Sequence, residues 1–386
     1  MNIKKIKPCY NLGKSGLLII LAVFFIAISS VQAQEKKKKK RKKKPVYEVN
    51  FKLATIYDDN ILKYSDKYLQ RFMNSEDEGR FHIDTYDDVI FFTALQMSSS
   101  FYIFKKKKSV VNAEVSRRTY AVNKIKNWNY MAFGFRQYIT KRLSFKFSYS
   151  YIPEFYVRHF RDDQWIAIYG YDEIVFQPYA FAKDNYGFWA QNTFFKSTRI
   201  KLSLYYSPYY HNEHYTEYDS KNWTYGAQIY QGVHKRVKIE AGYQFVTSDA
   251  KGYDASFQTP ETTFGPDATY VEDRFTFGLA WQLPKIKKMS NSFSAKVGFQ
   301  NRYYSSSYRP IIDPLHVGRV DKNIRWYFNY KLRLNKKMQL RAYYNLYIRD
   351  TETGAEINKQ YVSNEKDYKQ NIFGLEFIYK LKFSKR

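Results

Sequence analysis

The chain has 386 residues, with 64 Lys and Arg against 36 Asp and Glu, which gives a formal net charge of +28. Aromatic residues make up 20% of the chain, although 26% of its residues are charged. Disordered chains lack large rings, and a content of 16 Gly and 10 Pro excludes collagen-like and low-complexity classes. The composition therefore indicates a folded protein with an excess of positive charge.

The first 33 residues have the pattern of a secretory signal peptide. Lysines precede an apolar segment at 16–30, and Val31-Gln32-Ala33 follows the small-x-small cleavage rule. The apolar segment is too short for a comfortable spanning helix, and the alternative is an uncleaved signal anchor. Cys9 precedes the apolar segment, so a chain cleaved near Ala33 would contain no cysteine. We therefore predict an exported protein with a signal peptide at 1–33.

A basic tail follows at 34–45, where residues 36–44 are nine consecutive cations. Such a block repels itself and stays extended in solvent, so one interpretation is a flexible periplasmic tail. The other is an electrostatic tether to anionic lipid headgroups or cell-wall polymer. Nucleic acid is the usual partner of a basic run. An exported chain rarely meets it, and we expect no nucleic-acid partner.

From residue 46 onward, apolar and polar residues alternate with a period of two, which is typical of strands with one apolar face. In 324–334, for example, Ile324, Trp326 and Phe328 share one face, and Arg325 and Lys331 share the other. No apolar stretch after Ala33 reaches the 18 residues of a spanning helix. The alternation is unbroken in ten segments: 47–53, 111–115, 143–151, 200–206, 237–245, 275–283, 293–299, 324–334, 340–348 and 373–383.

Two architectures accommodate such strands. A soluble sandwich or barrel turns the apolar faces inward, so that Trp326, Phe328, Leu340 and Phe377 would meet in a dry core. An outer-membrane barrel turns them toward lipid and lines its lumen with the polar faces. Segments of about 9–13 residues and the export signal favour the second, because a tilted strand needs roughly 9–11 residues to cross a bilayer. An aromatic girdle is predicted from tyrosine pairs near strand ends: Tyr205-Tyr206, Tyr209-Tyr210, Tyr303-Tyr304 and Tyr343-Tyr344.

The connections between these segments differ in length. Short cationic turns are predicted at 104–109, 139–143, 195–200, 233–237, 284–293 and 334–338. Longer polar links are predicted at 58–87, 120–128, 158–172, 208–222, 247–273, 304–323 and 350–370. Periplasmic turns that are short and outer loops that are long are typical of outer-membrane barrels. Six hairpins with a first and a last strand give about 14 strands and two periplasmic termini. Because of Pro178 and the mixed polarity of 172–195, counts of 12 or 16 strands remain as alternatives.

The final segment, 371–383, resembles the C-terminal recognition strand of bacterial outer-membrane β-barrel proteins. Gly374, Phe377 and Tyr379 match its glycine and two hydrophobic positions, and Phe383 is the aromatic residue near its end. The segment departs from the pattern in two ways: Ile372 stands where a polar residue is usual, and Ser384-Lys385-Arg386 follows the aromatic that is commonly last. The resemblance covers 46–386 as architecture. It implies an all-β, transmembrane, antiparallel up-and-down β-barrel in the cell outer membrane, inserted by the barrel-insertion machinery. Fourteen strands suit several such groups, including fatty-acid-type transporters and surface-lipoprotein assembly modifiers.

The polar faces carry more cations than acids, and Lys or Arg in a pore favours the entry of anions. The predicted lumen-lining residues are Arg325, Lys331, Arg333, Arg341, Lys238, Lys296, Glu240 and Glu376. We therefore predict a channel or transporter for small polar, possibly anionic, solutes. The alternative is a non-conducting structural or export-complex barrel that binds periplasmic or surface proteins through its loops or basic tail.

Catalytic and metal-binding signals are weak. His211 and His214 have a ligand-like spacing without a third partner nearby, and His159 with Asp162 could be placed in a hydrolase pair at the barrel rim. The acidic loop 58–87 could hold calcium, although its spacing is not that of an EF-hand. The sequence contains no P-loop, dinucleotide glycine fingerprint or zinc pattern. We therefore expect no enzyme activity, no cofactor and no metal site.

Overall fold

The computed structural model describes residues 45–76, 79–103, 107–162, 175–195, 197–253 and 266–384. The predicted signal peptide and the lysine run at 36–44 lie outside the described residues, so their boundaries stay predictions. Within the described ranges, no helix combines the length and the apolar character that a membrane crossing requires.

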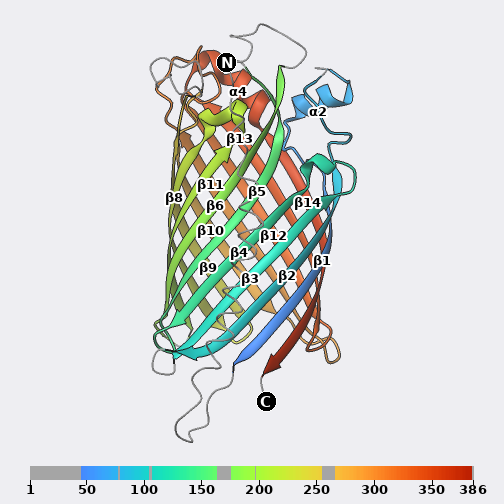
Figure 1. Cartoon of the computed structure of the whole chain (residues 1–386), viewed down its shortest axis with the longest axis vertical. Coiled ribbons are helices and arrows are strands. Elements are labelled where there is room, and N and C mark those ends of the chain that lie inside the picture. The colour runs from blue at the N-terminus through green and yellow to red at the C-terminus, as the bar shows by residue number, and fades with distance from the viewer. Residues whose placement is uncertain are drawn as a thin grey trace, which may run out of the picture.

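Fourteen antiparallel strands close into one barrel, in which every strand pairs with its chain neighbours and β1 (Val46–Asp58) pairs with β14 (Tyr368–Ser384) (Figure 1). The strands between them are β2 (Asp88–Ile103), β3 (Lys107–Tyr120), β4 (Trp128–Tyr138), β5 (Ser144–Arg161), β6 (Phe176–Thr193), β7 (Thr198–His211), β8 (Ser220–His234), β9 (Val237–Ala250), β10 (Tyr270–Gln282), β11 (Ser290–Tyr304), β12 (Arg319–Arg333) and β13 (Met338–Thr353). The predicted all-β up-and-down barrel of about 14 strands is confirmed.

Short helices occupy the longer loops of the described chain. They are α2 (Asp66–Met73), η1 (Lys124–Lys126), η2 (Glu213–Tyr218), η3 (Glu356–Asn358) and α4 (Lys359–Lys366). The short turns all lie at the opposite end of the barrel, where Val46 is paired with Ser384. The start of β1 and the end of β14 therefore lie on the side of the short turns. The longer loops and their helices lie at the other end of the barrel.

The uncertain region 172–195 contains one strand, β6, so the alternatives of 12 or 16 strands are wrong. Pro178 lies opposite His159, beside a register shift of β5 between Tyr156 and Arg158. Proline lacks the N–H that a regular ladder uses, and a bulge accommodates that gap. The strands are also longer than the predicted segments: β5 and β6 have 18 residues each, more than a bilayer crossing needs.

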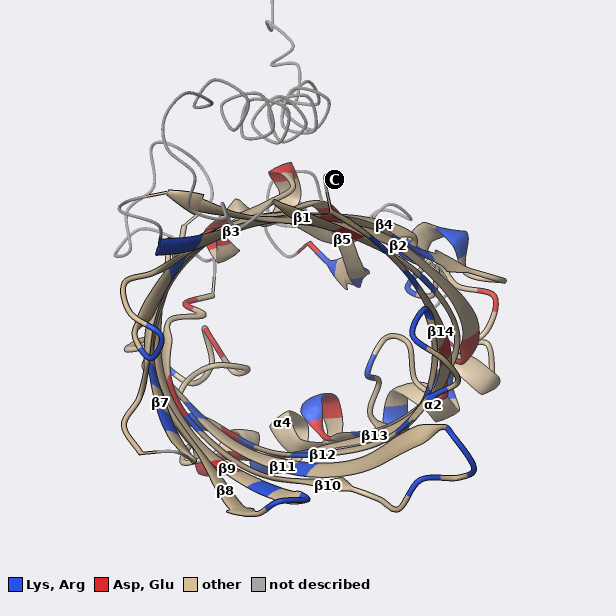
Figure 2. Cartoon of the chain, turned by 90° about the horizontal axis from the view of Figure 1, so that it is seen from below, with Lys and Arg blue, Asp and Glu red and all other residues tan. Residues whose placement is uncertain are grey.

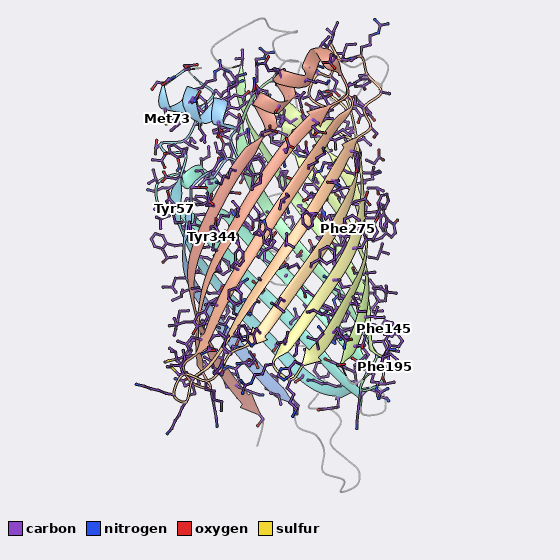
Figure 3. The ribbon with its side chains drawn as sticks, turned by 180° about the vertical axis from the view of Figure 1, so that it is seen from behind. Tyr57, Met73, Phe145, Phe195, Phe275 and Tyr344 are labelled. Carbon is purple, nitrogen blue, oxygen red and sulfur yellow. The ribbon has the colours of Figure 1, made fainter. Side chains whose placement is uncertain are left out.

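The apolar faces point outward. On β10, Phe275, Phe277, Leu279 and Trp281 occupy successive outward positions and keep 41%, 50%, 41% and 46% of their surface exposed. Phe275 extends away from the barrel in Figure 3, and Trp326 on β12 is also exposed. Such an apolar surface on a single chain is typical of contact with lipid. The soluble alternative, with these residues in a dry core, is therefore wrong.

The tyrosine pairs do not all belong to an outer girdle. Neighbouring side chains on a strand point to opposite faces, so each pair sends one ring into the lumen. Tyr344 stacks outside against Phe373, with ring centroids 4.7 Å apart. Its neighbour Tyr343 lies inside, directly over Gly374, where a Cβ would overlap the ring. Only half of each pair can therefore reach the lipid-water boundary.

Candidate functional site: the lumen and its mouth

The inner wall of the barrel is polar and predominantly cationic. A cavity of about 660 Å³ lies against β7 to β12. Its charged lining consists of five cations and one acid: Arg199, Lys238, Arg274, Lys296, Arg325 and Glu240. Lys296 pairs with Glu240 at 3.0 Å, and Arg274 pairs with Glu272 on its own strand. The lumen cavity is therefore left with a net positive charge.

The other predicted lumen residues lie below this cavity, toward the short turns. Lys331 on β12 and Arg341 on β13 are directly opposite each other in the register. Like charges in that position repel each other, and the nearby Glu376 compensates part of that repulsion. Arg341 donates to Asn329 Oδ1 at 2.9 and 2.7 Å and lies 3.6 Å from a Glu376 carboxylate oxygen. Arg333 follows at the exposed end of β12.

Two further cations of the inner wall, on β4 and β7, were not among the predicted residues. Arg136 on β4 is paired in register with Lys146 on β5, and its guanidinium lies 4.7 Å from the Trp189 ring centroid. Arg199 on β7 lies 4.1 Å from the Tyr230 ring centroid. The alternation of Phe133, Phe135 and their polar neighbours would have placed Arg136 on an inner face. Arg199 stands one residue before an alternating segment and carries no comparable signal.

The loop-bearing end of the lumen, called the mouth here, is narrowed by the β1–β2 loop. Ile61, Leu62 and Tyr64 of this loop are each no more than 5% exposed and join an apolar cluster with the inner wall of β1 and β2. Helix α4 lies inside the outline of the barrel beside β12 and β13 (Figure 2). A 3.0 Å ion pair between Lys67 of α2 and Glu365 of α4 ties the two elements together.

A second cavity, of about 540 Å³, opens in the mouth. Its cations come from distant parts of the chain: Lys63, Arg158, Arg161, Arg302, Arg319, Arg349 and Lys366. Many of its remaining residues are aromatic: Phe160, Tyr179, Phe181, Tyr209, Tyr215, Tyr218, Tyr270, Tyr304 and Tyr361. The mouth therefore combines positive charge with ring surfaces, which the sequence pattern did not predict.

Two buried carboxylates organise the arginines on the inner wall. Glu272 is fully buried and accepts from Arg302 Nε at 2.8 Å. Asp321 is also fully buried and accepts from Arg319 Nε at 2.6 Å and Nη2 at 2.8 Å. Charge-assisted bonds of this kind hold both ends in place. Arg302 and Arg319 are therefore fixed parts of the wall.

The pKa values of two lysines in the longer loops are strongly lowered. Burial lowers the pKa of Lys126 from 10.5 to about 7, and the positive charges of Lys63 and Arg158 add to this effect. Burial also lowers the pKa of Lys366 to about 7. The groups that face Lys366 are three cations and one acid, Arg319, Arg158, Arg349 and Glu365. Both lysines therefore change charge near neutral pH.

The structure does not bring the candidate catalytic and metal-binding residues together in one site. His211 lies 3.3 Å from Asp219, whereas His214 lies 3.0 Å from Asp162, so the two histidines engage different acids. His159 bonds to the Tyr156 hydroxyl at 2.6 Å rather than to an acid. Across the described ranges, no group of three His, Cys, Asp or Glu is placed to hold a metal ion.

Comparisons with known proteins give likeness of fold only. No known family matches the sequence, and no curated protein matches it. Among solved structures, a bacterial polysaccharide outer membrane secretin has a TM-score of 0.44 at 8% identity, covering 87% of this chain and 98% of its own. The outer membrane channel DcaP of Acinetobacter baumannii has a TM-score of 0.44 at 12% identity, covering 90% and 100%. Likenesses this distant carry no argument about activity.

Proposed function

We propose that this chain is an outer-membrane β-barrel that forms a passive channel for small anionic solutes. The observation that carries the proposal is the 660 Å³ lumen cavity with five cations and one acid in its lining. A charged lumen biases which ions enter, and fixed Lys and Arg charges favour anions. The exposed apolar outer surface supports insertion in lipid, with the short turns, the start of β1 and the end of β14 on the periplasmic side.

Planar-bilayer recordings in a KCl gradient test the selectivity. Replacing Arg325, Lys331 and Arg333 with Ser removes three inward charges of β12 and leaves the Arg341 bonds to Asn329 intact. The reversal potential should then move toward that of a cation-selective pore. The matched control is Lys322→Ser, which removes one cation from the outward face of the same strand, where it pairs with Glu352 at 2.7 Å.

Three results would contradict the proposal, the third of them in the control. One is a wild-type protein that inserts without any conductance. Another is an unchanged reversal potential in the triple variant, because the β12 charges would then lie outside the ion path. A shift in the Lys322→Ser control as large as that in the triple variant would also show that the lumen is not the selective element.

A second candidate is a non-conducting barrel that serves as a scaffold for partner proteins. The observation that favours it is the β1–β2 loop, whose buried residues Ile61, Leu62 and Tyr64 occupy part of the mouth. In that case the wild type should be silent in bilayers. Deleting 36–44 should then remove co-purifying partners, whereas a simple pore would not need this segment.

The last strand supports a role in assembly. Phe377, Tyr379 and Phe383 lie on the outward, apolar face of β14, and Gly374 lies inside beneath Tyr343. We include recognition of this strand by the barrel-insertion machinery in the proposal. Replacing Phe377 with Asp should lower the amount of folded barrel in the outer membrane, measured by its heat-modifiable mobility in gels.

A further inference from the structure

Four cations converge on the mouth cavity, and we call them the mouth cations. They are Lys63 in the β1–β2 loop, Arg158 on β5, Arg349 on β13 and Lys366 at the end of α4, and all four line the 540 Å³ cavity. Four separate elements of the barrel therefore contribute one positive charge each to the same space.

Two aromatic rings hold these cations close together. Arg158 Cζ and Lys366 Nζ each lie 5.6 Å from the centroid of the Phe160 ring. Arg349 Cζ and Lys63 Nζ lie 4.9 and 6.0 Å from the centroid of Tyr368. The Arg158 guanidinium also donates to the backbone oxygen of Lys63 at 3.3 Å, which joins the two pairs.

The acids of the cavity do not neutralise the mouth cations. Among the described residues, no carboxylate oxygen lies within 4.0 Å of the side-chain nitrogens of Lys63, Arg158 or Lys366. Arg349 lies 3.8 Å from Asp321, which is already engaged by Arg319.

Four carboxylates line the cavity, Asp162, Glu217, Asp313 and Glu365, and three of them have partners of their own. Asp313 pairs with His316 at 2.7 Å, and Glu365 pairs with Lys67 at 3.0 Å. Asp162 pairs with His214 at 3.0 Å. The seven Lys and Arg side chains of the cavity still outnumber its four carboxylates, so the mouth keeps a net positive charge.

Crowded cations without counter-charges favour the binding of an anion. Desolvation and mutual repulsion both oppose the charged form of such groups, and an anion placed among them relieves the repulsion. Desolvation in the mouth lowers the pKa of Lys63, although its side chain stays exposed to the cavity. The charges of Arg325 and Arg349 lower this pKa further, against the opposing effects of Tyr368 and Asp58. The arginines stay charged at any physiological pH.

Tyrosine rings also line the cavity. Tyr179, Tyr209, Tyr218, Tyr270 and Tyr304 line it, and Tyr179 and Tyr218 pack edge to face with centroids 5.3 Å apart. Tyrosine offers an apolar face together with a polar hydroxyl, which suits a ligand with a flat or pyranose ring. A bare inorganic anion would use only the cationic part of this surface.

We propose that the mouth cavity binds a ring-bearing carboxylate, with the carboxylate among the mouth cations and the ring against the tyrosines. The proposal deepens the anion channel by naming the solute class that would be captured at its entrance, and it rests on that function. A volume of about 540 Å³ falls in the range of small-molecule binding sites and accommodates one such ring.

Calorimetric titration of the full-length barrel in lipid nanodiscs at pH 6.5 tests the site. The probes are benzoate, glucuronate, acetate and benzamide. Benzoate or glucuronate should bind at least about tenfold more tightly than acetate, which lacks the ring, and than benzamide, which lacks the charge. Benzoate and glucuronate together distinguish an aromatic acid from an acidic sugar as the better ligand.

The variant Lys366→Gln removes one mouth cation, whose ammonium group makes no hydrogen bond to the part of the chain that the structure describes. It should weaken binding of the better ligand by about fivefold or more. The matched control is Lys359→Gln on the same helix, where the lysine pairs with Glu356 and does not line the cavity. Equal effects of the two variants would overturn the proposal, because a general charge effect would then explain them.

Other outcomes separate this inference from the channel itself. Acetate binding as tightly as benzoate would overturn the ring contribution, and benzamide binding as tightly would overturn the cationic one. No binding of any probe overturns the site, even if the protein conducts anions. Probe binding by a barrel that is silent in bilayers would support the site and refute the channel.

Discussion

Lys126 gives a prediction whose size follows from the structure. This lysine ends η1, is only 4% exposed, and donates to the backbone oxygens of Tyr156 at 2.9 Å and Val157 at 3.2 Å. Both acceptors lie where the register of β5 shifts against β6. The bulge frees carbonyl groups from the ladder, and a buried ammonium group satisfies them.

The energetic consequence is a pH-dependent cost of folding. The drop of the pKa from 10.5 to about 7 corresponds to roughly 5 kcal/mol, at about 1.4 kcal/mol per unit. Below pH 7 the lysine is charged in both states, and the folded barrel bears the full cost. Between pH 7 and 10.5 the unfolded state binds more protons, so the stability rises with pH by up to about 1.4 kcal/mol per unit. Above pH 10.5 the cost is absent.

Lys126→Met removes this titration while keeping a long side chain. Urea unfolding in lipid vesicles at pH 7, 8 and 9 should show the wild type gaining stability relative to the variant, by roughly 2–3 kcal/mol over the range. The two carbonyl oxygens lose their donor in the variant at every pH, which adds a constant offset. Lys124→Met, at an exposed position of the same helix, is the control and should leave the slope unchanged. A constant difference between wild type and Lys126→Met would refute the reasoning.

Three further predictions address the wall and the mouth. Gly374→Ala should cost about 1–3 kcal/mol in urea unfolding, because its Cβ would overlap the Tyr343 ring; an unchanged midpoint would show that the ring moves freely. The preference for anions in bilayer recordings should fall from pH 6 to 8, as Lys366 loses its charge near its pKa of about 7, and Lys366→Gln should flatten that profile. Glu272→Gln should destabilise the barrel by about 3 kcal/mol, and exposed Glu352→Gln by less than about 1 kcal/mol, in the same unfolding assay.

The alternation of residues was sufficient to predict the barrel because it is a direct property of a two-sided strand. Trp326 and Arg325 face opposite sides of β12 because they are neighbours on one strand. The apolar face then contacts lipid, and the polar face contacts water. The strand count was predicted where turns were short and cationic. It was uncertain around Pro178, because a bulge and a proline disturb the period that carries the signal.

The same property corrects the tyrosine prediction. A pair such as Tyr343-Tyr344 looks like an interfacial cluster in the sequence, but one ring must lie in the lumen. There Tyr343 covers Gly374, a contact that depends on the register between β13 and β14. Register follows from the length of each turn and the hydrogen bonds of both strands, which a single-strand pattern does not contain.

The alternation of apolar and polar residues could not predict the mouth cations, for a different reason. Lys63 lies in a loop and Lys366 ends the short helix α4, so the strand period does not relate either residue to the barrel wall. They meet Arg158 only after barrel closure brings β1 and β14 together. Their sequence separation is nearly the length of the barrel domain. Only the tertiary arrangement of the loops reveals that these cations share one cavity.

The apolar cluster and the cation cluster of the mouth depend on each other. Lys63 follows buried Leu62 and precedes buried Tyr64, and its backbone has a φ of 53°, which costs a residue with a Cβ roughly 1 kcal/mol or more. Burial of the flanking apolar side chains offsets that strain. Because the loop is anchored on both sides of Lys63, the cation is held at the cavity before any solute arrives. A cation that is already fixed can bind an anion without the entropy cost of ordering a loop. This preorganisation favours capture of a solute at the entrance of a passive pore.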